Sequence, residues 1–79
     1  MNTLFLYTTE GCHLCEEAEK ILQPLALEFH FKIEKVEIAD DGYLVDIYGT
    51  RIPVIKMGTE KDDLGWPFDH HDVIEYLTE

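Results

Sequence analysis

Basic residues are scarce in this 79-residue chain, which has 6 Lys+Arg against 17 Asp+Glu and a formal net charge of -11. Phosphate backbones and anionic membrane surfaces repel such a surface, so we expect neither nucleic acid nor membrane among its partners. Long apolar runs are missing too, since none approaches the ~20 residues of a membrane span. The first residues, Met1 to Tyr7, form too short a run and lack the basic start of a signal peptide. These shortages predict a cytoplasmic protein.

Cysteine is also scarce, because only Cys12 and Cys15 are present. The cytoplasm keeps ordinary disulfides reduced, so a lone close pair there is more often catalytic or metal-binding than a structural staple. Internal repeats and linkers are absent from the sequence, and its 46% hydrophobic fraction is ordinary for a globular protein. We therefore expect one small domain over residues 1–79, acting as a monomer.

The two cysteines form a Cys-x-x-Cys motif where an apolar run, Leu4 to Tyr7, gives way to a helix-forming run that starts at Glu16. A thiol at the start of a helix faces unpaired backbone N–H groups and the positive end of the helix dipole, and both favour the thiolate. Cys12 is therefore the candidate nucleophile. Cys15 lies one turn further along, within reach of a mixed disulfide on Cys12, and is the candidate resolving thiol.

The helix dipole and the charged neighbours of the motif have opposing effects on the pKa of the Cys12 thiol. The helix dipole stabilises its thiolate by ~0.3 to 1 kcal/mol. The negative charges of Glu10, Glu16 and Glu17 oppose this effect, and His13 supports it only when protonated. We expect the pKa of the Cys12 thiol to lie moderately below that of an ordinary cysteine.

Hydrophobic periodicity predicts alternating strands and helices. The expected strands are residues 3–7, 31–38 and 54–57, followed by a turn at Gly58 to Glu60 and a polar edge strand over 61–64; the expected helices run from Leu14 to Phe29, from a cap at Asp40 to Tyr48, and from a cap at Asp69 to Leu77. Pro24 predicts a kink, or an early end near Gln23 with the helix resuming beyond it. The second strand changes parity between Ile33 and Val36, which fits either a bulge or a strand buried on both faces at its end.

Apolar residues define the expected inner faces of the helices. For the first helix these begin at Leu14, and for the second they are Leu44, Ile47 and Tyr48, with Gly49 as the C-terminal stop.

This order of elements, with Cys-x-x-Cys after the first strand and a proline at the start of the third, resembles the thioredoxin-like fold in its minimal glutaredoxin form. The segments Leu6 to Cys15 and Tyr48 to Val54 are similar to those of small bacterial glutaredoxin-like proteins. The resemblance implies one α/β glutaredoxin-like domain, ordered β-α-β-α-β-β-α, with a central four-stranded mixed sheet. It also implies that Ile52-Pro53 is a cis peptide bond beside the cysteines, where the Ile52 backbone would pair with substrate like an added strand.

Several residues depart from the patterns of the two best-known subfamilies. Glutaredoxins usually carry a lysine three residues before the first cysteine, where this chain has Thr9. Glutaredoxins also carry a pair of glycines followed by an acidic cap. This chain has equivalents of only two of these residues, Gly65 and Asp69. Thioredoxins carry a tryptophan and a buried aspartate before the first cysteine, where this chain has Gly11 and Leu6. Neither subfamily's substrate can therefore be transferred to this chain.

The resemblance and the motif together predict a thiol-disulfide oxidoreductase acting on disulfides of proteins or small molecules. Its catalytic residues would be Cys12 and Cys15, and its substrate-binding residues Arg51, Ile52, Pro53 and His13. Arg51 stands beside the expected cis proline, where it could hold a substrate carboxylate. We expect no required metal or organic cofactor, and we expect glutathione or an unidentified reductase to supply electrons.

Two alternatives stay open at this stage. The chain could be a thioredoxin-like docking module whose cysteines act as a slow redox sensor. It could also bind zinc through Cys12 and Cys15 with His13, His70 or His71, provided that the first and last helices bring their N-termini together.

Overall fold

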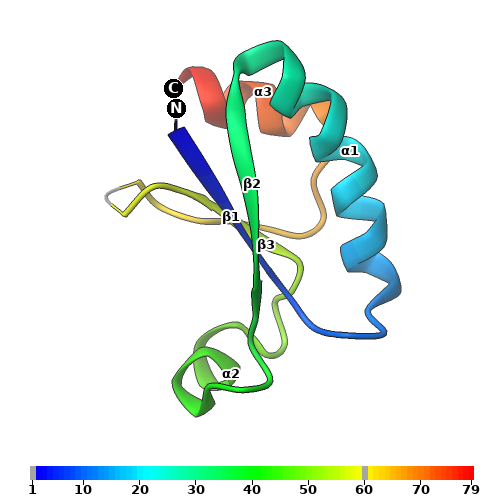
Figure 1. The fold of residues 1–79 in the computed structure, drawn as a ribbon, viewed down its shortest axis with the longest axis vertical. Coiled ribbons are helices and arrows are strands. Elements are labelled where there is room, and N and C mark those ends of the chain that lie inside the picture. The colour runs from blue at the N-terminus through cyan, green and yellow to red at the C-terminus, as the bar shows by residue number, and fades with distance from the viewer. Residues whose placement is uncertain (1, 60) are drawn as a thin grey trace.

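The computed structural model describes residues 2–59 and 61–79, so Glu60, the last residue of the expected turn, lies outside the described residues. The elements follow the predicted order (Figure 1). They are β1 (Asn2–Thr8), α1 (His13–Phe29), β2 (Phe31–Glu37), α2 (Gly42–Tyr48), β3 (Val54–Met57), β4 (Leu64–Gly65) and α3 (His70–Thr78).

The four strands form one mixed sheet in the order β2-β1-β3-β4. β1 pairs with β2 in parallel, while β3 is antiparallel to both β1 and β4. This arrangement confirms the predicted α/β class and its central four-stranded mixed sheet. It also places the end of β1, and hence the cysteine loop that follows it, between the end of β2 and the start of β3.

The sheet has a core on each face, because neighbouring residues of a strand point to opposite sides. Leu6 of β1 belongs to the larger core beneath α1 and α3, and Tyr7 packs against a smaller core beneath α2. In Figure 1 the short helix α2 lies at one end of the molecule, and both termini lie at the other. The buried residues of the larger core are Leu4, Leu6, Ala18, Leu22, Leu25, Phe31, Ile55, Phe68, Val73 and Tyr76, and those of the smaller core are Ile38, Tyr48 and Val54.

The two cores explain the parity change in the second strand. Residues Phe31 to Glu37 pair one-to-one with β1, so the strand contains no bulge. Ile33 packs against the larger core, whereas Ile38, just past the strand, is buried in the smaller one. The parity changes because Ile33 faces the larger core on one side of the sheet, whereas Ile38 faces the smaller core on the other side.

Helix α1 continues through Pro24, so the predicted end near Gln23 is wrong. Ala18 and Leu22 before the proline, and Leu25 after it, are all buried against the sheet. Tertiary burial of an amphipathic face supplies most of the stability of a helix in a protein, and here it outweighs one missing backbone hydrogen bond.

Helix α2 differs from its prediction at both the cap and the inner face. Its N-cap is Asp41, whose carboxylate accepts a hydrogen bond from the Tyr43 N–H at 2.9 Å, and not Asp40. Tyr48 is buried, but Ile47 is 36% exposed, because a helix of two turns presents only a narrow stripe to the sheet.

Gly49 follows α2 in a right-handed conformation, so positive φ is not the reason for glycine here. A Cβ atom at this position would lie 2.5 Å from the carbonyl oxygen of Val45. Close approach of the backbone therefore favours glycine at the end of this helix.

The last strand is shorter than predicted, covering Leu64–Gly65 only. The preceding residues are attached to α3 instead: the Tyr76 hydroxyl donates to the Asp62 carbonyl at 2.6 Å, and the Lys61 ammonium donates to the Tyr76 carbonyl. The same hydroxyl accepts a hydrogen bond from the Met57 N–H at 3.0 Å. These bonds replace the strand pairing that we expected over residues 61–63.

The start of α3 agrees with its prediction. Asp69 and Asp72 form a capping box in which each carboxylate accepts the other residue's backbone N–H, at 2.9 and 3.1 Å. The hydrogen bond from the Asp72 backbone lowers the pKa of Asp69. Phe68 and Val73 are buried in the same core, and Trp66 packs edge-on against Phe68 at 5.0 Å between ring centroids.

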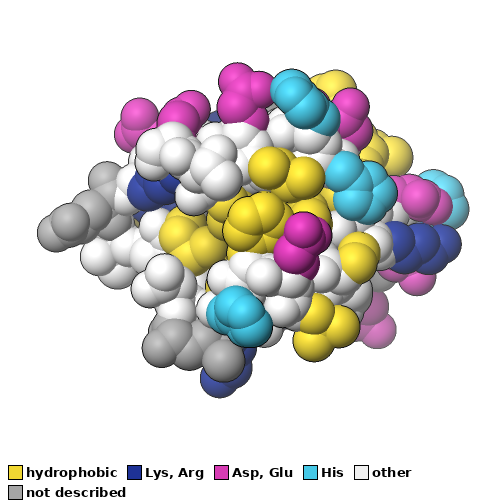
Figure 2. Space-filling model, turned by 90° about the horizontal axis from the view of Figure 1, so that it is seen from above, with side chains coloured by type: hydrophobic (Ala, Val, Ile, Leu, Met, Phe, Trp, Pro, Cys, Tyr) yellow, Lys and Arg dark blue, Asp and Glu magenta, His cyan; other side chains and the backbone are white. Residues whose placement is uncertain are grey.

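Acidic side chains are spread widely over the surface. Figure 2 looks onto the end of the molecule that carries the termini, where hydrophobic side chains lie at the centre and acidic ones stand mostly around them. Among the residues that the structure describes, no helix combines the length and apolar character needed to span a membrane.

Candidate active site

Cys12 and Cys15 are joined by a disulfide at the start of α1, with their Cα atoms 5.2 Å apart. Cys12 is the N-cap of the helix, and its Sγ accepts a hydrogen bond from the Cys15 N–H at 3.1 Å. Gly11 precedes it with φ of 79°, a left-handed conformation that favours glycine. The turn that presents Cys12 thus depends on local backbone geometry.

The two sulfur-bearing residues differ in their access to solvent. Cys15 is 4% exposed and belongs to the buried stripe of α1, whereas Cys12 is half-buried at the edge of the helix. The buried stripe begins at Cys15, so Leu14, which we expected to open it, is 46% exposed. A molecule arriving from solvent therefore meets Cys12 first.

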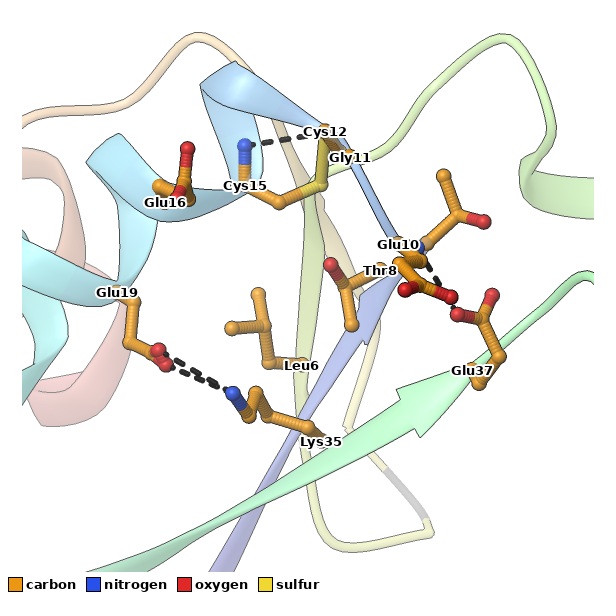
Figure 3. A pocket seen from close by; sticks show the side chains of 11 residues that line it. Leu6, Thr8, Glu10, Gly11, Cys12, Cys15, Glu16, Glu19, Lys35 and Glu37 are labelled. Carbon is orange, nitrogen blue, oxygen red and sulfur yellow. Dashed lines mark hydrogen bonds and ion pairs between the residues drawn. A yellow bond between two sulfur atoms is a disulfide. The ribbon is translucent and has the colours of Figure 1, made fainter.

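A cleft of about 320 Å³ lies beside the disulfide, between the start of α1, the end of β1 and the end of β2 (Figure 3). Its lining residues are Leu6, Thr8, Thr9, Glu10, Gly11, Cys12, Cys15, Glu16, Glu19, Lys35 and Glu37. Figure 3 shows Glu16 and Glu19 on the helix side of the space and Glu10 and Glu37 on the other. The cleft is therefore acidic and includes both cysteines.

Only some of the cleft's carboxylates have partners. The Lys35 ammonium lies 3.1 Å from Glu19, and Glu37 accepts hydrogen bonds from the N–H groups of Ala39 and Glu10 at 3.0 and 2.9 Å. The Ala39 hydrogen bond is the main reason why the pKa of Glu37 lies below its ordinary value, so this residue stays ionised. Among residues 2–59 and 61–79, the one ion-pair partner of the Glu16 carboxylate is the His13 ring, at 3.8 Å.

Ile52 and Pro53 lie on the other side of the cysteine loop from this cleft. Tyr7 pairs with Val54, which places Pro53 beside Thr8 at the end of β1. The Ile52-Pro53 peptide bond is cis, as is Trp66-Pro67, which we did not predict. The Ile52 N–H donates to the Tyr48 carbonyl at 3.0 Å, and within residues 2–59 and 61–79 its own carbonyl accepts no hydrogen bond. Among the described residues, that carbonyl is therefore open to pairing with another backbone.

Arg51 holds a carboxylate of this chain. Its two terminal nitrogens donate to Asp63 at 2.5 and 3.4 Å, and the guanidinium carbon lies 5.6 Å from the centre of the Tyr48 ring. The Asp63 hydrogen bond raises the pKa of Arg51. The pair ties the loop before Pro53 to the segment before β4, and a substrate carboxylate would have to compete with Asp63 for the guanidinium.

His13 is 80% exposed, and its ring nitrogens each lie 3.8 Å from a carboxylate of Glu16 or Glu17. The ring is absent from the lining of the cleft. Its expected role in binding substrate stays a prediction.

A zinc site that uses both cysteines is not assembled in this structure. Among the described residues, one group of three or more metal-ligating side chains comes within 4.8 Å of one another, and it consists of Asp69, His71 and Asp72. The two aspartates are engaged in the cap of α3. No histidine of the described chain completes a set with Cys12 and Cys15.

The sequence did not reveal the part of the cleft that β2 provides. Lys35 and Glu37 lie twenty or more residues after the cysteines, and the parallel pairing of β1 with β2 brings them close. The signal that could have located them is the strand order, because the ends of parallel neighbouring strands meet at one edge of a sheet.

The sheet order and the cysteine pair at the start of α1 are those of a glutaredoxin-like domain of thioredoxin fold. A family model described as Glutaredoxin-like domain (DUF836) matches residues 3–78. The chain belongs to this family. Among curated proteins, none matches the chain significantly.

Solved structures agree with this assignment. The chain is 35% identical to protein XcR50 from X. campestris, with a TM-score of 0.80 and 95% of each chain covered. It is 32% identical to protein Ne2328 from Nitrosomonas europaea, with a TM-score of 0.81, covering 95% of this chain and 89% of that one. Thioredoxin 1 from Thermosipho africanus, at 15% identity and a TM-score of 0.73 over 96% of this chain and 90% of that one, shares the fold.

Proposed function

We propose that the protein is a thiol-disulfide oxidoreductase that uses the Cys12–Cys15 pair. The observation that carries this proposal is the asymmetry of the pair: Cys12 caps a helix at the rim of an open cleft, while Cys15 is buried behind it. A nucleophile needs access to its substrate, whereas a resolving thiol needs access only to the nucleophile.

The reaction begins with the reduced pair. The Cys12 thiolate attacks one sulfur of a substrate disulfide, forming a mixed disulfide and releasing the other substrate sulfur as a thiolate, which takes up a proton. Cys15 then loses its proton and attacks Cys12, forming the intramolecular disulfide and releasing the second substrate thiolate. Two electrons pass from the protein to the substrate, and the product is the state seen in the structure.

Groups around Cys12 support these steps. The Cys15 N–H already points at the Cys12 sulfur and would stabilise its thiolate by a charge-assisted hydrogen bond. We assign substrate orientation to the Ile52 carbonyl beside Pro53, which would pair with the backbone next to the substrate disulfide.

The reduced pair must be regenerated by a two-electron donor. The two candidates are glutathione and a separate reductase. We propose disulfides of proteins or small molecules as substrates, a monomeric enzyme, and no requirement for a metal or organic cofactor.

Turnover is tested with hydroxyethyl disulfide and with insulin, using dithiothreitol as the electron donor. We expect both to be reduced faster than by dithiothreitol alone, and Cys12→Ser to abolish the difference. Cys15→Ser should retain a mixed disulfide with substrate, visible by mass spectrometry, because the first step remains and the second is lost. Rates no better than free dithiothreitol with both substrates would refute the proposal and favour a docking or redox-sensing module.

A further inference from the structure

We propose that the carboxylates around the cleft make the enzyme selective for disulfides that carry positive charge close to the sulfur atoms. Anionic disulfides, oxidised glutathione among them, are then poor substrates. The inference rests on the proposed function, since it concerns substrate choice at the same pair of cysteines.

The first step of the argument is the position of the charges. The cleft is lined by both cysteines, by four glutamates and by one lysine, so its formal charge is four negative against one positive, or -3. A group joined to Cys12 in the mixed disulfide has this space directly beside it (Figure 3). Charge complementarity therefore favours a cationic group there.

Lys35 shows the kind of group that the cleft accommodates. It reaches in from β2, and its ammonium contacts both oxygens of Glu19, at 3.1 and 3.5 Å. An alkylammonium thus already lies against one carboxylate of the lining. Glu10 and Glu16, which flank the cysteines in the sequence, have no Lys or Arg within 4 Å among residues 2–59 and 61–79.

The opposite side of the cysteine loop does not offset this charge. Arg51, the cation nearest to Pro53 in the sequence, is bound to Asp63 through both terminal nitrogens. An anionic substrate would have to displace that carboxylate to reach the guanidinium. The cleft side therefore disfavours anions, and on the other side the guanidinium of Arg51 is already occupied by Asp63. Glutathione carries a net negative charge.

The test uses three small disulfides of similar size: cystamine, which is dicationic, hydroxyethyl disulfide, which is neutral, and dithiodipropionate, which is dianionic. Each rate constant with the reduced protein is divided by that of free dithiothreitol with the same disulfide, which removes differences in leaving-group reactivity. Oriented fields in clefts change association rates by roughly 10-fold to 10³-fold. We expect a normalised preference of about tenfold or more for cystamine over dithiodipropionate at ~10 mM salt, falling towards unity near ~0.5 M, where the Debye length is only a few ångströms.

Two variants and a matched control assign the effect to the cleft. Glu10→Gln and Glu16→Gln should each reduce the preference severalfold. Glu28→Gln removes the same charge from the exposed far end of α1, roughly 18 Å along the helix from Glu16. The variants are compared with wild type at ~0.1 M salt, where the ~10 Å Debye length is shorter than that distance, so this control should leave the preference unchanged.

The possible outcomes separate the two proposals. Equal normalised rates for the three disulfides would overturn the charge selectivity while leaving the oxidoreductase activity established. If Glu28→Gln reduces the preference as much as Glu16→Gln does, the assignment to the cleft is overturned, because the preference would then depend on the net charge of the whole protein. Failure to reduce even the neutral disulfide would instead refute the proposed function.

Discussion

In the reduced protein, Cys12 should ionise more readily than an ordinary cysteine. The perturbation is the loss of the disulfide, made in Cys15→Ser so that one thiol remains. The hydrogen bond to the sulfur at 3.1 Å becomes charge-assisted once Cys12 ionises. Such bonds contribute ~1.5 to 3 kcal/mol, and a helix N-terminus adds ~0.3 to 1.

Nearby carboxylates reduce this gain. An exposed carboxylate ~8 Å away in water raises the free energy of the thiolate by ~0.5 kcal/mol before screening by salt. Glu10 and Glu16 together therefore subtract ~1 kcal/mol. The remaining stabilisation, ~1 to 3 kcal/mol, corresponds to a pKa lowered by roughly one to two, since ~1.36 kcal/mol equals one pKa unit.

The assay measures the rate of alkylation by iodoacetamide as a function of pH. We expect the midpoint for folded Cys15→Ser to lie at least about one pH unit below that of the same protein unfolded in urea. In Cys12→Ser, the remaining Cys15 should react slowly while the protein is folded, because that residue is buried. A folded midpoint equal to or above the unfolded one, near ~8.5, would refute the argument that the helix start activates Cys12.

Three further predictions concern stability. Tyr76→Phe removes a hydroxyl that serves two backbone groups, and should lower the free energy of unfolding by ~1 to 3 kcal/mol in urea titrations; an unchanged midpoint would contradict this. Gly49→Ala should destabilise by ~0.5 to 3 kcal/mol because its Cβ would meet the Val45 carbonyl, whereas Gly42→Ala, with open space around it, should not; equal effects would be inconsistent with the close approach. Folding lowers the pKa of Asp69. The ionised carboxylate therefore contributes its full stabilisation of the folded protein above the unfolded-state pKa of ~3.9, and this contribution is lost as the pH falls through the lower folded-state pKa. The difference in Tm between wild type and Asp69→Ala should therefore narrow as pH falls from about 5 to about 2, and a constant difference would rule the linkage out.

Local signals made the order of elements predictable. The apolar run before Cys12, the periodic stripe from Ala18 to Leu25 and the cap at Asp69 each depend on neighbouring residues, and all three appear in the structure. The cysteine pair could be identified for the same reason, since its spacing alone places both residues in one helical turn.

What the sequence could not predict depends on contacts between distant segments. Pro24 favours a helix end in any local analysis, and only burial on both sides of it shows why the helix continues. Ile47 has the right spacing for an inner face but lies beyond the narrow stripe that α2 buries. Lys35 and Glu37 join the cleft through strand pairing, so the charge beside the cysteines was partly hidden from the sequence.

The deep position of Cys15 has a consequence for oxidative damage. Peroxide arriving from solvent reaches Cys12 first and converts its thiolate to a sulfenic acid. The buried Cys15 thiol then condenses with the Cys12 sulfenic acid, releasing water and forming the disulfide before a second oxygen atom can add. We therefore expect irreversible over-oxidation chiefly in molecules in which the Cys15 thiol is missing or blocked.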